Sequence, residues 1–424
     1  MKQDVIVIGA GLAGTTTAWF LAQRGLRVTV LERRDHCGLE TSFANGALLT
    51  PSEADPWNAP GTFLRMLRWL GREDSPLLLR PRALPGMLAW GLKFLSASRP
   101  HRHSRSTRAN LRLALYSQSI LDELDRNLGI EYDRLHNGTL KIFRDRKSLK
   151  LSVELADALR ALGLDSRVLS AEQAVAMEPM LGAIARQLAG AIHYPSDGSG
   201  DAHLFTSGMH QHAVNAGVSF RFKTSVTKIH AASGRILRLE TGEGEVEADH
   251  YVLAAGSYSP LLAKPLGLRL PIYPVKGYSV SITPADSHSL RTPLVDFERK
   301  VVIAPLGRVI RVAGTAEFTG YDTSLNPSRC ANILRQAVAI LPWLEDPGRR
   351  NLVTYWTGLR PMTCDGPPIL GATPYANLFL NTGHGPLGWT LCAGSAKCVA
   401  ELVAGAACEI EMQDFSCRRF QHAG

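Results

Sequence analysis

The chain has 424 residues, 45% of them hydrophobic and 20% charged, a length and balance that fit an enzyme of two interleaved domains better than one small core. The formal net charge of +9 leaves nucleic acid, an anionic membrane and plain solubility open as its cause. No run of eighteen apolar residues occurs, so the sequence predicts no membrane-spanning helix.

The first 34 residues follow the pattern of a dinucleotide-binding unit. Residues 4–8 predict a buried strand, 15–24 a helix and 27–31 a second strand that ends at Glu32. Three glycines fill the turn between the first strand and the helix: Gly9, Gly11 and Gly14. The first permits the tight turn, the second lets a pyrophosphate approach the backbone, and the third brings the helix close to the sheet.

Glu32 stands where an acidic side chain of such a unit accepts hydrogen bonds from a ribose. A strand-helix turn without a ligand is the alternative, because glycine patterns of this kind also occur in ordinary turns. The complete order of strand, glycines, helix, second strand and carboxylate favours a nucleotide cofactor.

Residues 57–108 differ in composition from the rest of the chain. Two apolar clusters lie here, Phe63, Leu64, Met66, Leu67, Trp69 and Leu70 and then Met87, Leu88, Trp90, Leu92, Phe94 and Leu95. Four arginines follow them: Arg99, Arg102, Arg105 and Arg108. This pattern is typical of a peripheral membrane contact, and packing of both clusters on a substrate domain is the equal alternative. Nucleic acid is not favoured, because no stacking platform or known fold module accompanies the arginines.

The remaining elements alternate between helical and extended patterns. Helices are predicted over 111–128, 149–162, a short segment opened by the capping box Ser170–Gln173, 204–217, 326–341 and 388–405. Strands are predicted over 218–222, 251–254 and 378–380, with a hairpin over 236–249 and a strand-rich region over 272–315 that turns at Gly307.

Six stretches, spread almost from end to end, carry a family resemblance. They are residues 9–32, Thr41-Ser-Phe-Ala-Asn45, Tyr273-Pro-Val-Lys-Gly-Tyr278, Ile310-Arg-Val-Ala-Gly314, Trp356-Thr-Gly-Leu-Arg-Pro-Met362, and Asn381-Thr-Gly-His-Gly385 with Leu387-Gly-Trp-Thr390. On these stretches the chain resembles the FAD-dependent D-amino-acid dehydrogenases, within the larger group of D-amino-acid oxidase, glycine oxidase and sarcosine oxidase flavoproteins.

The resemblance implies FAD as the cofactor, held without a covalent bond because no cysteine matches the motif that tethers flavin in sarcosine oxidases. The residues expected to bind it are Gly9, Gly11, Leu12, Ala13, Gly14, Glu32, Arg33, Thr41, Ser42, Asn45, Val226, Ala255, Gly256, Gly358, Gly383, His384, Gly385, Leu387, Gly388, Trp389 and Thr390. The glycine-flanked turn at His384 leads into a helix whose dipole would stabilise negative charge on the reduced flavin.

Four residues are expected to serve the reaction. Arg360 is the foremost, because the matching arginine in glycine oxidase-like proteins holds the substrate carboxylate through a bidentate fork. An ion pair at the domain seam is the alternative for this residue. Arg311 is a second, weaker choice, Tyr278 is equally a carboxylate ligand or a core residue, and His384 is placed near the flavin.

The implied reaction is the oxidation of a D-amino acid to its imino acid, which water hydrolyses to the 2-oxo acid. A quinone or another electron carrier is the expected acceptor, reached by peripheral association with the cytoplasmic face of a bacterial inner membrane. Two alternatives stay open: an oxidase or a sarcosine- or proline-type secondary-amine dehydrogenase, and a flavin-carrying subunit of a hetero-oligomer.

The expected fold class is α/β, with a Rossmann-like FAD-binding domain and a second, mixed-sheet α+β substrate domain. The first domain is assigned to 1–56, 197–270 and 345–424, and the second to 57–196 and 271–344, with 57–108 a small amphipathic insertion.

Two positions depart from the family pattern. Leu48 stands where relatives have a glutamine, which predicts a more apolar pocket if the position faces the substrate, and Cys364 stands where relatives often carry proline. The seven cysteines show no C-x-x-C and no metal-ligand spacing, so the sequence predicts no metal site and indicates a reducing compartment.

Overall fold

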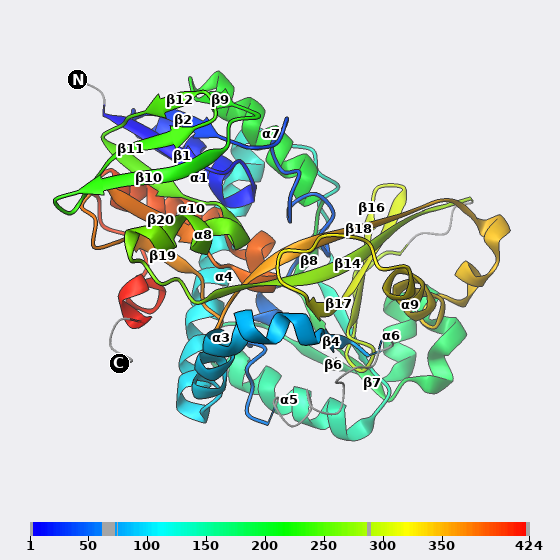
Figure 1. Ribbon diagram of the computed structural model, residues 1–424. Coiled ribbons are helices and arrows are strands. Elements are labelled where there is room, and N and C mark those ends of the chain that lie inside the picture. Colours follow the sequence, from blue (N-terminus) through cyan, green and yellow to red (C-terminus); the bar gives the residue numbers. More distant parts are fainter. Residues whose placement is uncertain (1–2, 62–72, 74, 286–289, 421–424) are drawn as a thin grey trace.

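The computed structural model describes residues 3–61, 73, 75–285 and 290–420. Two main sheets organise the molecule, one of six strands and one of nine (Figure 1). The first is almost entirely parallel and the second is mixed, so the predicted fold class is confirmed.

The six-stranded sheet has the order β19-β20-β13-β1-β2-β9. Its strands are β1 (Asp4–Ile8), β2 (Arg27–Leu31), β9 (Ser219–Arg221), β13 (His250–Leu253), β19 (Ile369–Ala372) and β20 (Leu378–Thr382). All pairs are parallel except β19 with β20. Segments from both ends and the middle of the chain therefore meet in one sheet.

Both faces of this sheet are covered, which is why its strands read as continuous apolar runs. Val5 and Val7 of β1 face a core formed with four helices, whereas Ile6 and Ile8 face a core formed with a small three-stranded sheet. The four helices are α1 (Leu12–Gln23), α4 (Pro100–Leu128), α7 (Ala202–Asn215) and α10 (Gly388–Val403). The small sheet consists of β10 (Val226–Ala232), β11 (Arg235–Thr241) and β12 (Gly244–Val246).

The nine-stranded sheet has the order β18-β14-β17-β16-β15-β5-β7-β6, with β4 paired to β17. Its long strands are β14 (Ile272–Pro284), β17 (Val309–Phe318) and β18 (Arg350–Thr363). The shorter ones are β4 (Leu77–Leu79), β5 (Thr139–Phe143), β6 (Arg167–Leu169), β7 (Gly190–Tyr194), β15 (Leu294–Asp296) and β16 (Val301–Leu306). A separate short pair joins β3 (Leu48–Leu49) to β8 (Gly198–Ser199).

Further helices complete the second domain. They are α5 (Arg146–Arg160), α6 (Ala171–Met177) and α9 (Pro327–Val338), and a short α8 (Ser259–Ala263) follows β13. The capping box at Ser170 and Gln173 is present, Gly129 ends α4 with left-handed backbone, and Gly307 turns the hairpin between β16 and β17. The predicted capping box and hairpin turn are confirmed.

Two segments pack differently from the expected domain assignment. β18 was assigned to the FAD-binding domain from its motif, but it pairs with β14 along its whole length in the large sheet. Conversely, α4 was assigned to the substrate domain, but its apolar residues pack with α1, α7 and α10 in the core of the six-stranded sheet. The sequence could not reveal either fact, because both depend on pairing between segments far apart in the chain.

The second apolar cluster of the 57–108 region forms α3 (Leu84–Ala97), whereas the first, Phe63 to Leu70, lies outside the described residues. One face of α3 packs on the large sheet: Met87, Trp90 and Phe94 are buried, and Trp90 Nε1 donates to the Met362 carbonyl at 2.9 Å. The sequence left two alternatives for this cluster, a membrane contact or packing on the substrate domain. The buried face of α3 shows the second.

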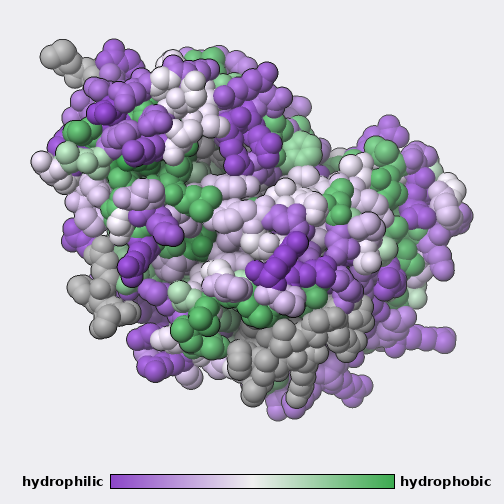
Figure 2. Space-filling view, in the orientation of Figure 1, coloured by the Kyte–Doolittle hydropathy of each residue, from purple (hydrophilic) through white to green (hydrophobic). Residues whose placement is uncertain are grey.

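The opposite face of α3 remains open. Four leucines there, which we call the leucine stripe, have exposed fractions of 49, 64, 62 and 38%: Leu84, Leu88, Leu92 and Leu95. Their spacing places all four on one side of the helix, and Figure 2 shows hydrophobic side chains gathered over α3. Among the helices of the described residues, none combines the length and the apolar composition that crossing a bilayer requires.

Candidate active site

The turn between β1 and α1 is built so that only glycine fits. Gly9 has φ of 106°, and a β-carbon on it would lie 2.8 Å from the Ala254 carbonyl oxygen. A β-carbon on Gly14 would lie 1.9 Å from the carbonyl oxygen of Gly9. Gly11 is the N-cap residue and brings no capping side chain, and Gly11, Leu12 and Ala13 line a cavity, so the start of α1 offers a place for an anion.

The carboxylate of Glu32 is fixed beside this turn. It is 8% exposed and accepts hydrogen bonds from Ala10 N at 2.7 Å and Arg34 N at 2.8 Å, one on each oxygen. Each oxygen keeps a second lone pair for a hydroxyl donor. The geometry therefore suits the ribose hydroxyl groups of a dinucleotide.

One cavity of about 930 Å³ runs from the glycine turn into the large sheet. Most residues expected to bind FAD line it: Gly9, Gly11, Leu12, Ala13, Glu32, Arg33, Thr41, Ser42, Asn45, Val226, Ala255, Gly256, Gly358, His384, Gly385, Leu387, Gly388 and Trp389. Gly14, Gly383 and Thr390 do not line it. Gly14 keeps α1 close to β1, Gly383 adopts φ of 78°, and Thr390 accepts a hydrogen bond from Thr50 N at 2.9 Å.

The loop that follows Glu32 is anchored on both sides of the cavity. Ser42 Oγ accepts from Leu12 N at 3.2 Å, which ties the loop to α1. Thr41 Oγ1 donates to the Leu359 carbonyl at 2.8 Å, which ties it to β18. Leu48, the apolar departure from the family pattern, also lines the cavity. The loop thus links the two domains at the cavity wall.

The turn at His384 leads from β20 into α10 at the cavity. Gly385 has φ of 57°, and Gly385, Leu387 and Gly388 line the cavity at the start of the helix. The His384 ring is buried and bonded through Nε2 to Ser395 Oγ at 3.0 Å. Burial lowers the pKa of His384 to about 4, so its imidazole is neutral near pH 7. Positive charge at this wall therefore comes from the helix dipole, not from the histidine.

Arg360 presents a guanidinium to the cavity from β18. Its Nη1 donates to the Thr315 carbonyl at 3.1 Å, and its guanidinium lies 5.8 Å from the Trp57 ring centroid. No carboxylate pairs with it among the described residues, so the ion-pair alternative is not supported there. Burial lowers the pKa of Arg360 to about 10, which still leaves it charged near neutral pH.

Arg311 has a different environment. Its Nε donates to Ser281 Oγ at 2.8 Å, its Nη1 donates to the Asn45 carbonyl at 3.1 Å, and its Nη2 lies 3.7 Å from Asp201. It does not line the cavity. Arg311 therefore supports the loop that carries Asn45, and the expectation that it contacts the substrate is not favoured.

Tyr278 lines the cavity, but its hydroxyl points away into a buried network. The hydroxyl donates to Glu317 Oε2 at 2.5 Å, and Lys276 Nζ lies 3.6 Å from the same carboxylate. Arg80 Nε donates to the other Glu317 oxygen at 2.7 Å. Of the two alternatives for Tyr278, the core residue is favoured, because Glu317 already accepts the hydrogen bond of the hydroxyl.

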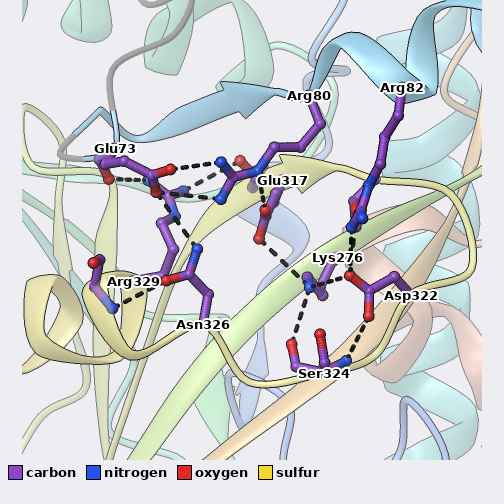
Figure 3. A network of polar contacts seen from close by, with 12 residues as sticks. Glu73, Arg80, Arg82, Lys276, Glu317, Asp322, Ser324, Asn326 and Arg329 are labelled. Carbon is purple, nitrogen blue, oxygen red and sulfur yellow. Dashed lines mark hydrogen bonds and ion pairs between the residues drawn. The ribbon is translucent and has the colours of Figure 1, made fainter.

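This network joins three parts of the second domain (Figure 3). Its members come from the segment around β4, from β14 and β17, and from the start of α9: Glu73, Arg80, Arg82, Lys276, Glu317, Asp322, Ser324, Asn326 and Arg329. Lys276 and Glu317 are 1 and 2% exposed. Sequence reasoning missed the network entirely, since seven charged residues at scattered positions give no common motif.

Sequence reasoning also missed polar residues at the cavity wall. Lys141 Nζ lies 2.6 Å from Glu53 Oε1, and both residues line the cavity together with Trp57 and Trp356. Glu53 and Lys141 come from separate elements, and no sequence motif links them. The seven cysteines, all within the described residues, form no disulfide and none lines the cavity.

Comparisons with known proteins cover nearly the whole chain. A family model described as FAD dependent oxidoreductase matches residues 4–402. A protein of Paramagnetospirillum magneticum named D-amino acid dehydrogenase is 46% identical over 98% of this chain and 98% of its own length. Another of that name, from Dechloromonas aromatica, is 44% identical over 97% of this chain and 100% of its own.

Solved structures show the same fold over the whole chain. Glycine oxidase from Geobacillus kaustophilus superposes with a TM-score of 0.78 at 24% identity and full coverage of both chains. L-proline dehydrogenase from P. horikoshii gives a TM-score of 0.79 at 18% identity, covering 99% of this chain and 98% of its own. At these identities the likeness concerns the fold alone.

Proposed function

Because the chain belongs to the FAD-dependent oxidoreductase family, we propose that it is a D-amino-acid dehydrogenase that oxidises D-amino acids to imino acids. The cofactor of this family is FAD. The proposal on substrate class is supported by the name that relatives of 39 to 46% identity share. It is supported independently by the chemistry of the cavity.

Arg360 is the observation that carries the proposal. A charged guanidinium faces the cavity from within the protein, with one carbonyl partner and no carboxylate partner in the described part of the chain. Such a group needs an anionic partner, and a carboxylate accepts two parallel hydrogen bonds from the planar fork. An amino acid substrate carries such a carboxylate. Trp57 and Leu48 also line the cavity and would supply apolar surface for the side chain of the substrate.

The other residues of the cavity have separable roles. The glycine turn and the start of α1 would hold the pyrophosphate of FAD, and Glu32 would accept from its ribose. The start of α10 would face the flavin ring with its positive dipole end. When bound without a covalent bond, FAD supplies a two-electron acceptor. Arg360 would fix the substrate by its carboxylate, so orientation supplies most of the rate.

Anaerobic reduction of the bound flavin tests this function directly. The oxidised enzyme is mixed with one candidate substrate at a time, and the loss of flavin absorbance is followed. The candidates are D-alanine, other D-amino acids, their L-enantiomers, glycine, sarcosine and L-proline. We expect rapid bleaching by D-amino acids and slow or no bleaching by L-enantiomers. Faster bleaching by L-proline or sarcosine would instead assign the chain to secondary amines. Bleaching that needs an added protein would support the hetero-oligomer alternative.

The leucine stripe of α3 supports a proposal on the electron acceptor. Exposed leucines lie beside the basic start of α4, where Arg99, Arg102, Arg105 and Arg108 are exposed. Apolar side chains that enter the headgroup boundary, next to arginines that meet anionic lipid, are the two components of peripheral membrane binding. We therefore propose that α3 docks on an anionic bilayer, the cytoplasmic face of a bacterial inner membrane, with a quinone as acceptor.

A further inference from the structure

Three potential metal ligands meet behind the loop that leads from Glu32 to Thr41. His36 and Cys37 lie in this loop, and His210 lies on α7. One ligand atom from each residue lies within 4.8 Å of the others. His36 Nδ1 and Cys37 Sγ are 3.3 Å apart. The cluster is separate from the cavity, which none of the three residues lines.

The distances suit a shared tetrahedral ion. A nitrogen at about 2.0 Å and a sulfur at about 2.3 Å from one zinc ion lie about 3.5 Å apart, close to the observed separation of His36 and Cys37. The imidazoles are also held in place by aromatic contacts. His36 stacks on Phe222 with ring planes 3° apart, and His210 meets Phe220 edge-on with centroids 4.4 Å apart.

We propose that His36, Cys37 and His210 bind a zinc ion, with water in the fourth position on the exposed side of His36. Two imidazoles and one thiolate are donors that Zn²⁺ prefers, whereas Mg²⁺ and Ca²⁺ prefer oxygen ligands. Among the described residues, no carboxylate belongs to the cluster. With three protein ligands, the ion would keep a fourth position that is open to solvent.

Protonation is compatible with this chemistry. Burial lowers the pKa of His210, so its imidazole is neutral and free to ligate at neutral pH. Burial raises the pKa of Cys37 to about 11, so the free residue is a thiol. Binding then forms a Zn–S bond, breaks the S–H bond and releases one proton to solvent, with no change of oxidation state.

The position of the site gives it a consequence for the loop. Gly38 N donates to the Ala10 carbonyl at 2.9 Å, so the segment next to Cys37 rests on the glycine turn. A zinc ion bound by His36, Cys37 and His210 would cross-link this segment to α7. We expect zinc to raise the thermal midpoint of the holoenzyme for this reason.

The test uses the flavin-loaded enzyme after treatment with a chelator. Zinc chloride is titrated by calorimetry, and the bound ion is examined by X-ray absorption spectroscopy. We expect one sulfur at about 2.3 Å and nitrogen ligands at about 2.0 Å. Cys37→Ser, His36→Ala and His210→Ala should each weaken binding at least about tenfold, since even indirect partners of a ligand cost that much.

Two matched controls guard the interpretation. His212→Ala removes a histidine from the same helix outside the cluster, and Cys330→Ser removes a thiol of α9 that belongs to no group of potential metal ligands among the described residues. Both should bind zinc like the original chain, and flavin content reports that each variant is folded. A zinc shell without sulfur, or unchanged affinity in His36→Ala or Cys37→Ser, would overturn the proposal.

Discussion

The guanidinium of Arg360 lies across the backbone of Gly277, so closely that a β-carbon on Gly277 would be 2.3 Å from Arg360 Nη1. β14 and β18 are neighbours along their whole length, and a glycine at this one position lets the arginine cross from one strand over the other. The direction in which Arg360 reaches the cavity therefore depends on a residue of a different strand.

Gly277→Ala should displace the guanidinium without removing it. The flexible end of the arginine must move by about an ångström to make room for the methyl group, and misplacement of that size costs on the order of tenfold to a hundredfold in kcat/KM. Steady-state kinetics with D-alanine measures the loss, and flavin content should stay unchanged. Kinetics equal to those of the original chain would show that the position of Arg360 has no bearing on catalysis.

Arg360→Ala should lower the rate with amino acids on the order of a hundredfold or more, because the bidentate anchor for the carboxylate is lost. Arg360→Lys keeps the positive charge but not the fork, so it should recover only part of the rate. Both variants should retain FAD. Undiminished activity in Arg360→Ala would place the carboxylate anchor at another residue.

Gly14→Ala should abolish flavin binding. The added methyl group would stand 1.9 Å from a backbone oxygen, so the turn itself must shift. Backbone displacement costs more than the roughly 1.4 kcal/mol that corresponds to a tenfold loss of affinity. The ratio of flavin to protein absorbance measures occupancy. Gly242→Ala, at an exposed turn with open space around it, is the matched control and should bind flavin normally.

Leu88→Glu combined with Leu92→Glu should abolish binding to anionic vesicles. The double variant places two carboxylates in the leucine stripe. They would have to enter the apolar part of the bilayer, and the anionic lipid headgroups would repel them. Flotation with phosphatidylglycerol-containing liposomes at low and high salt gives the measurement, and high salt should weaken binding of the original chain. Leu352→Glu, at a leucine that is 60% exposed elsewhere, controls for surface charge.

Two results together would contradict both the docking surface and the quinone acceptor. The original chain would stay unbound to liposomes at low salt, and it would form hydrogen peroxide at its full turnover rate. We expect the original chain to form peroxide slowly. We expect it to reduce a quinone analogue in vesicles rapidly. Buried Met87, Trp90 and Phe94 stay untouched in the double variant, so its fold should be retained.

Asp197 should make stability depend on pH. Burial raises its pKa to about 7, while Ser52 Oγ at 2.5 Å and Thr139 Oγ1 at 2.6 Å donate to the carboxylate. The folded chain then binds more protons than the unfolded chain between about pH 4 and pH 7, so this group's contribution to stability falls as pH rises through that window.

Asp197→Asn removes the titration and keeps polar partners for both hydroxyls. The original chain should lose thermal stability between about pH 5 and about pH 8. The fall in the thermal midpoint over this range should therefore be smaller in the variant. Asp157→Asn, at an exposed carboxylate on α5, should leave the difference unchanged. An identical pH dependence in Asp197→Asn and the original chain would refute the assignment.

The sequence by itself determined the local features of this protein. Helix ends such as Gly129, where the backbone is left-handed, depend on short-range sterics, which neighbouring residues decide. Most helices and strands were predicted for the same reason. The family motifs marked Glu32 and Arg360 because each belongs to a contiguous stretch of residues.

Only the tertiary structure decided which polar groups face the cavity and which are already paired. Arg311 and Arg360 both lie in family motifs, yet the first is bonded to Ser281 and the Asn45 carbonyl while the second is left with Thr315. Strand pairing also moved β18 into the large sheet, and it brought His210 to His36 and Cys37. A hydrogen-bond partner from a distant strand or helix leaves no periodicity in the sequence, so the chemistry of a site is fixed only when the chain folds.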